Sequence, residues 1–179
     1  AAFNGMEMEN MTRGHGWRFL DLGRRIERSQ AMVQLLRISM GLRSGLGLAL
    51  EPVLEIADSL MTYRRRYYAQ PRLPGVLELL VCDVSNPRGL AFQVESLAGH
   101  IEALPNPSGP SGTLIPLNLR EVARLRRRIG ELDDERGSGS ASESIDRVVD
   151  HLDAFAMELS SISDSLTGRF FSHTVPRVS

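Results

Sequence analysis

Residues 17–43 read WRFLDLGRRIERSQAMVQLLRISMGLR, and the spacing of their apolar side chains decides the fold. Apolar residues recur there at alternating intervals of three and four, with one serine filling the polar slot of the series. The series consists of Phe19, Leu22, Ile26, Ser29, Val33, Leu36 and Met40. This spacing places the side chains on one face of an α-helix. We therefore expect a helix of about 27 residues that packs against other helices.

The same period returns along the rest of the chain. It predicts helices over 51–70, 75–81, 117–134 and 142–170, a further helix that Asn86 caps and that runs to Leu104, and a short helix over 4–11. In 142–170 the apolar series is Ile145, Val149, Leu152, Ala156, Leu159, Ile162 and Leu166. Residues rich in Pro, Gly and Ser predict flexible linkers over 105–113 and 137–142. We expect a single all-α domain over 1–179, an up-and-down bundle of four to five long helices with short accessory helices.

Composition excludes several classes of protein. The 179 residues carry 21 basic and 22 acidic side chains, and the formal net charge of −1 argues against a broad cationic nucleic-acid binder. Every basic residue is Arg, so Schiff-base chemistry and a phosphate-loop lysine are excluded. Cys82 is the single cysteine, which favours a reducing compartment, and we expect the cytoplasm. No apolar run approaches the length of a membrane-spanning helix, so we expect no membrane contact.

Charged residues form complementary stripes on the last two predicted helices. The basic stripe is Arg120, Arg124, Arg127 and Arg128, and the acidic stripe is Glu143, Asp146, Asp150 and Asp153. An antiparallel hairpin of these helices would pair the two stripes along its seam. The alternative, an RNA contact by the basic stripe, lacks the aromatic residues on which bases stack.

Two further polar clusters together form one candidate site, a polar wall. Arg18, Arg24, Glu27 and Arg28 border the apolar stripe of the first long helix, and Tyr63, Arg64 and Tyr67 share the 51–70 segment. Planar guanidinium groups bind carboxylates in pairs of hydrogen bonds, so either cluster could hold an anion. Either could instead lock neighbouring helices together through ion pairs, since an unpaired charge at a core edge is costly.

Templates of known enzymes are missing from the sequence. It contains no Glu-x-x-His, His-Glu-x-x-His or Gly-x-Ser-x-Gly motif, and its four histidines are scattered. Nothing resembles a nucleophile with its base. We expect no metal, no cofactor and no catalytic residue in this chain.

Longer motifs resemble a known family, in order along nearly the whole chain. They are the string 16–28, GWRFLDLGRRIER, which includes Trp17; 63–67, YRRRY; Asp83 with Asn86-Pro87-Arg88; and 166–173, LTGRFFSH, which ends at His173. These segments are similar to blocks of the bacterial Alpha-E family, an α-helical domain with a Glu-Arg motif. A Glu-Arg dipeptide alone would carry no weight, because the chain holds a second one at Glu135-Arg136.

The resemblance implies a functional context. Alpha-E domains are often fused to, or encoded beside, circularly permuted ATP-grasp ligase domains, with transglutaminase-like peptidases as further neighbours. Members usually carry an earlier helical portion that has no counterpart here, and this chain does not begin with Met. We therefore expect the C-terminal part of a longer protein that serves peptide or amide synthesis or modification, an inference by analogy of family.

Two hypotheses of function remain open. The first is a non-catalytic helical module that docks to an ATP-grasp-type amide ligase or positions its substrate. The second is an enzyme of amide or peptide chemistry that uses Glu27 as base and the Arg groups as an anion clamp. The first predicts Glu27 paired with Arg and closed off from solvent, and the second predicts Glu27 in a cleft without a bonded Arg.

Overall fold

The computed structural model describes residues 12–41, 49–105, 127 and 141–171. Within these ranges the chain forms helices joined by turns and contains no strand, which confirms the all-α bundle with short accessory helices. The predicted helices 4–11 and 117–134 lie outside the described residues, apart from Arg127, and so do nearly all of the two predicted linkers. The basic stripe lies outside them except for Arg127, so its expected pairing with the acidic stripe is not described, and Asp153 of the acidic stripe forms an ion pair with Arg37. In the described part of the chain, no helix is both long and apolar enough to cross a membrane.

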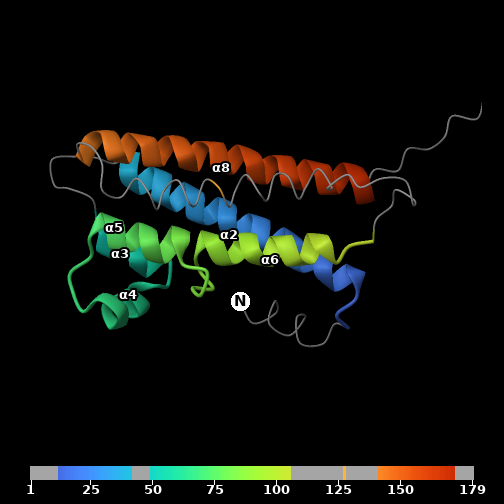
Figure 1. The fold of residues 1–179 in the computed structure, drawn as a ribbon, viewed down its shortest axis with the longest axis horizontal. Coiled ribbons are helices and arrows are strands. Elements are labelled where there is room, and N and C mark those ends of the chain that lie inside the picture. The colour runs from blue at the N-terminus through green and yellow to red at the C-terminus, as the bar shows by residue number, and fades with distance from the viewer. Residues whose placement is uncertain (1–11, 42–48, 106–126, 128–140, 172–179) are drawn as a thin grey trace, which may run out of the picture.

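Helix α2 (His15–Gly41) forms the centre of the described bundle, as its apolar stripe predicts. Helices α6 (Leu90–Glu102) and α8 (Ala141–Phe170) both pack against it. Figure 1 shows that both run antiparallel to α2. The ring of Phe19, near the start of α2, accordingly lies 5.1 Å from the ring of Phe170 at the end of α8. The long helices predicted over 17–43 and 142–170 are thus confirmed, and α8 already includes residues 141 and 142 of the predicted linker.

The core lies where the apolar stripes of these helices meet. Five of the six apolar members of the α2 stripe are buried, and Phe19 is partly buried. Complete burial of one such aliphatic side chain stabilises the fold by about 1.5–3 kcal/mol. On α8 the deeply buried residues include Val148 and Phe155, in place of the predicted Val149 and Ala156, which are only partly buried.

The predicted helix 51–70 is wrong as a single element. The structure divides it into α3 (Leu50–Ile56) and α4 (Leu60–Tyr67). Asp58 takes the left-handed conformation with φ 50°. The Ser59 N–H donates to the carbonyl of Leu54 at 2.8 Å, and the Asp58 N–H donates to that of Glu55 at 2.9 Å. These two bonds form a Schellman motif, which ends α3 and redirects the chain.

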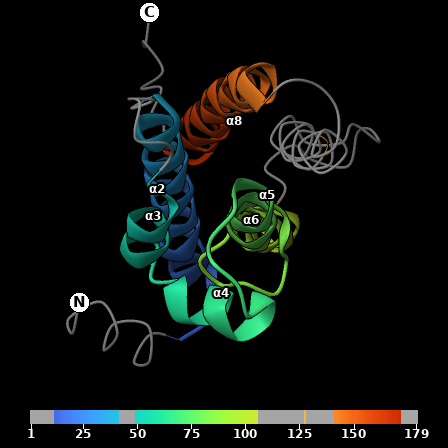
Figure 2. The same ribbon diagram turned by 90° about the vertical axis from the view of Figure 1, so that its left-hand side faces the viewer.

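The short helices gather near the end of the bundle where α2 finishes (Figure 1). The apolar helix predicted over 75–81 is α5 (Leu73–Leu77), which continues into one π-helical turn, η1 (Glu78–Cys82). Helix α3 packs against α2 and α5, and α4 packs against α3 and α5 (Figure 2).

The prediction that Asn86 caps the following helix is wrong, because α6 begins at Leu90 with Gly89 at its N-cap. The buried Asn86 instead braces the loop before α6. Its amide donates to the carbonyl of Leu79 at 2.8 Å, and its side-chain oxygen accepts the backbone N–H of Arg88 at 3.1 Å. A buried amide must satisfy both ends, and the loop offers those partners.

Candidate functional site

A buried polar network joins α2 to α6. The Asp21 carboxylate, on α2, is almost completely buried, and its Oδ2 accepts from Arg25 Nε at 3.0 Å. The same oxygen is hydrogen-bonded to His100 Nε2, on α6, at 2.6 Å. The Trp17 ring packs edge-on against the His100 imidazole at 5.3 Å between centroids. A buried carboxylate with two such partners fixes the positions of the two helices relative to each other.

Gln93, on α6, extends this network toward the start of its helix. Its side chain is 1% exposed. Arg25 Nη1 donates to Gln93 Oε1 at 3.1 Å, and Gln93 Nε2 donates to the carbonyl of Pro87 at 2.6 Å. Both ends of the amide are therefore held, and Gln93 lies in a fixed position behind the space beside it.

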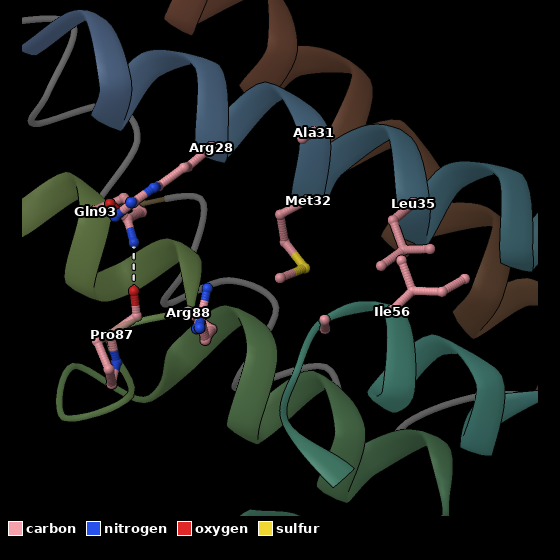
Figure 3. Close-up of a pocket in the computed structure, with 9 residues that line it drawn as sticks. Arg28, Ala31, Met32, Leu35, Ile56, Pro87, Arg88 and Gln93 are labelled. Atoms are coloured by element: carbon pink, nitrogen blue, oxygen red, sulfur yellow. Dashed lines mark hydrogen bonds between the residues drawn. The ribbon is translucent and has the colours of Figure 1, made fainter. Parts of the chain in front are cut away.

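That space is an open pocket of about 230 Å³ between α2, the end of α3 and the loop that leads into α6. We call it the Arg28–Arg88 pocket. Its lining consists of Arg28, Ala31, Met32, Leu35, Ile56, Ala57, Pro87, Arg88 and Gln93. Figure 3 shows Arg28, Arg88 and Gln93 gathered at one end, while Leu35 and Ile56 lie together at the other. The pocket thus has a cationic end and an aliphatic end, a combination suited to an amphipathic anion.

The two arginines of the pocket differ in their partners. Arg28 is exposed and forms no ion pair with any residue that the structure describes. Arg88 is also exposed, and one nitrogen of its guanidinium pairs with the Asp58 carboxylate. The described side chains around the cationic end therefore carry a net charge of +1.

Within the part of the chain that the structure describes, Glu27 is neither paired with an arginine and closed off from solvent nor located in a cleft, the two positions that the two hypotheses of function predict. It is exposed on α2, does not line the Arg28–Arg88 pocket and has no ion pair among the described residues. Neighbouring residues of an α-helix point in different directions, so Arg28 can line the pocket while Glu27 faces away from it. Of the other α2 residues in the predicted cluster, Arg18 and Arg24 are half-buried and neither lines the pocket.

Tyr63 and Tyr67, the other predicted cluster, lie together on α4, away from the Arg28–Arg88 pocket. Their rings are 4.5 Å apart. The buried Tyr63 hydroxyl accepts the backbone N–H of Arg72 at 3.1 Å. Arg64 points elsewhere and forms an ion pair with Glu51 of α3.

Arg66, of the same segment, supplies the guanidinium beside these rings. It lies over the Tyr67 ring at 5.7 Å and pairs with the carboxylates of Asp83 and Glu78. Burial, followed by the neighbouring Glu78 carboxylate, raises the pKa of Tyr67 to about 12. Burial would raise the pKa of Asp83, but hydrogen bonds from Ser85 and Arg66 outweigh it, so that pKa is lowered. These ion pairs tie α4 to η1, which is a structural role.

The remaining motif residues are dispersed. Trp17 packs against His100 of the Asp21 network, and Asp83 forms an ion pair with Arg66 of α4. Asn86 holds the loop before α6, and Arg88 lines the pocket. His173 lies outside the described residues. The structure therefore unites Arg28 with Arg88 and separates both from Tyr63, Arg64 and Tyr67.

Sequence reasoning missed Gln93 and His100 as members of the site. The spacing of Asp21 and Arg25 by one helical turn was the available signal for the network. Nothing in the sequence connects Asp21 with a histidine 79 residues further along the chain. That contact arises from the packing of α6 on α2.

The sequence of the chain matches a known protein family. A family model described as a predicted α-helical domain with a conserved Glu-Arg motif matches residues 1–171. The chain belongs to the Alpha-E family. Of the Glu27-Arg28 pair on α2, the arginine lines the pocket and the glutamate lies at the surface.

Relatives of this Alpha-E chain are found in mycobacteria. Uncharacterised proteins of Mycobacterium bovis and of two strains of Mycobacterium tuberculosis are 28% identical to it over 167 residues. The alignment covers 92% of this chain and 18% of each relative. The chain therefore spans less than a fifth of the length of these proteins. No solved structure matches it.

Proposed function

We propose that this chain is a non-catalytic helical module that serves an ATP-grasp-type amide or peptide ligase. It docks to the ligase, fused to it or as a separate chain, or positions the ligase's substrate. Membership of the Alpha-E family supports this proposal, because Alpha-E domains are often fused to, or encoded beside, circularly permuted ATP-grasp domains. A transglutaminase-like peptidase is a further proposed partner, and the cytoplasm is the proposed compartment.

The observation that carries the proposal is the lining of the Arg28–Arg88 pocket. Its groups are two guanidiniums, one amide, one thioether and aliphatic carbons. Such groups hold a ligand through hydrogen bonds, charge and apolar contact. They supply neither a nucleophile nor a base that titrates near neutral pH. The pocket therefore suits binding and positioning, with the chemistry performed by the ligase.

The alternative, an enzyme that uses Glu27 with an arginine clamp, finds no support in this geometry. A general base must lie within hydrogen-bonding reach of a substrate held beside the clamp. Glu27 is exposed on α2 and does not line the pocket that contains Arg28.

Affinity purification of the intact protein from its source cells tests the proposal. A tagged form is recovered with and without ATP, and the co-purified proteins are identified by mass spectrometry against a tag-only control. We expect an ATP-dependent amide ligase in the eluate, as a separate chain or as a domain of the tagged protein. Recovery of no ligase, together with amide hydrolysis or ligation by this chain alone, would contradict the proposal and favour the enzyme.

A further inference from the structure

The cationic end of the Arg28–Arg88 pocket has the charge and geometry for one carboxylate. Two of its lining residues are cationic and none is acidic, while the nearby Asp58 neutralises one of the two charges. A single monoanionic group would therefore balance the cationic end. Arg28 has its whole fork of donors available to such a group among the described residues, and this fork matches a carboxylate in size and direction.

Gln93 adds orientation to this charge. Because Arg25 and the Pro87 carbonyl hold its two ends, the amide cannot turn away when a ligand arrives. A polar group that is already fixed costs little conformational entropy on binding. The Asp21 network behind it thus positions the pocket's polar end without itself lining the pocket.

The opposite end of the pocket selects an apolar group. Met32 and Ala57 are largely buried there and form a surface that offers no hydrogen bond. Ile56, which borders this end, is 71% exposed. An aliphatic ligand group placed against Leu35 and Ile56 would remove this apolar surface from water (Figure 3).

The size of the pocket restricts the ligand further. Its volume of about 230 Å³ exceeds that of a cavity that binds benzene, about 150 Å³. It falls below the roughly 300–1,000 Å³ of pockets that enclose drug-sized molecules. The pocket therefore fits a molecule of the size of one amino-acid residue and is too small to enclose a nucleotide.

We propose that the Arg28–Arg88 pocket binds the C-terminal residue of a peptide that ends in an aliphatic side chain, with Arg28 and Arg88 holding the carboxylate and Met32, Leu35 and Ile56 contacting the side chain. This inference deepens the proposed function and rests on it for the ligand's role, since a peptide carboxylate is a group that an amide ligase joins to an amine. Binding itself needs no ligase, so the two proposals can be tested separately.

Isothermal titration calorimetry with two small probes tests this inference. N-acetylleucine carries the carboxylate and the aliphatic side chain, and N-acetylleucinamide has the same shape without the charge. We expect N-acetylleucine to bind the 179-residue chain with a Kd of about 1 mM, as is typical of a ligand of this size. The amide should bind at least about tenfold more weakly, because it lacks the charge-assisted hydrogen bonds.

Arg28→Gln and Arg65→Gln form a matched pair of variants. Both arginines are exposed on helices, but only Arg28 lines the pocket. Arg28→Gln should weaken N-acetylleucine binding about tenfold, and Arg65→Gln should leave it unchanged. Circular dichroism shows whether each variant is folded, and Arg88→Gln provides a second change within the pocket.

Three results would overturn the inference: no heat of binding with N-acetylleucine at several times its expected Kd, equal affinity for the acid and the amide, or unchanged affinity in Arg28→Gln and Arg88→Gln. The comparison of acid with amide uses the unaltered chain, so it decides the matter even where a variant does not fold. A ligase recovered by affinity purification alongside any of these results would leave the proposed module in place and remove only its ligand.

Discussion

At the scale of single residues, one buried carboxylate determines how the pocket is held. Asp21 hydrogen-bonds to Arg25 on its own helix and to His100 on α6, and Arg25 in turn holds Gln93 at the pocket. Glu27, the more conspicuous acid of the same sequence motif, lies at the surface. The acid that organises this region is therefore Asp21, which is buried next to Leu22 of the apolar stripe.

Asp21→Asn should destabilise the fold by about 2–3 kcal/mol, because hydrogen bonds to a charged group are lost and Arg25 keeps a weaker partner. Asp153→Asn is the matched control, since Asp153 pairs with Arg37 while its side chain remains 45% exposed. Its loss should stay below about 1 kcal/mol. Urea unfolding measures both free energies, and equal losses would contradict the structural role of Asp21.

Tyr67 gives a second prediction at this scale, in alkaline solution. Its folded pKa of about 12 lies above the ordinary value of about 10, so the protonated phenol is favoured in the folded state. The corresponding stability is fully present below about pH 10 and is lost as pH rises toward 12. In Tyr67→Phe, the tyrosinate absorbance titration should lack the component near pH 12. Persistence of that component would mean that another tyrosine carries the raised pKa.

At the scale of elements, the sequence predicts long stripes well and turns poorly. The 27-residue α2 and the 30-residue α8 were predictable because the period of their apolar residues runs without interruption. In α8, both Val148 with Phe155 and Val149 with Ala156 satisfy the alternation of threes and fours, so the period alone could not choose the buried pair. Asn86 before Pro87 has the pattern of a helix cap, but its side-chain amide donates to the carbonyl of Leu79 and does not cap α6.

The break between α3 and α4 gave no signal in the sequence, because an aspartate occupies the left-handed position that glycine usually takes. Asp58→Gly and Asp58→Ala both remove the ion pair with Arg88 and differ in the cost of that conformation. Asp58→Gly should be more stable than Asp58→Ala by about 1 kcal/mol in urea unfolding. Equal stability of the two variants would show that residue 58 does not adopt a positive φ.

At the scale of the whole molecule, the pocket exists only where α2, α3 and the start of α6 meet. Arg28 and Arg88 stand 60 positions apart in the sequence, and Ile56 comes from a third segment, so their convergence depends on tertiary packing. The sequence shows that both arginines belong to segments that resemble the Alpha-E family, but the sequence analysis grouped Arg28 with Tyr63 and Tyr67 instead of with Arg88. It could not predict the aliphatic end at all, because Met32, Leu35 and Ile56 look like ordinary residues of a helical core.

The most direct test of carboxylate binding in this pocket is the nuclear magnetic resonance signal of the Gln93 side-chain amide. A ¹⁵N-labelled chain is titrated with N-acetylleucine and, separately, with N-acetylleucinamide. We predict that the Gln93 amide signals move with the acid, following the Kd measured by calorimetry, and stay in place at the same concentrations of the amide. Signals that move only at residues remote from Arg28, Gln93 and Arg88, or that move equally with both probes, would contradict a carboxylate site between α2 and α6.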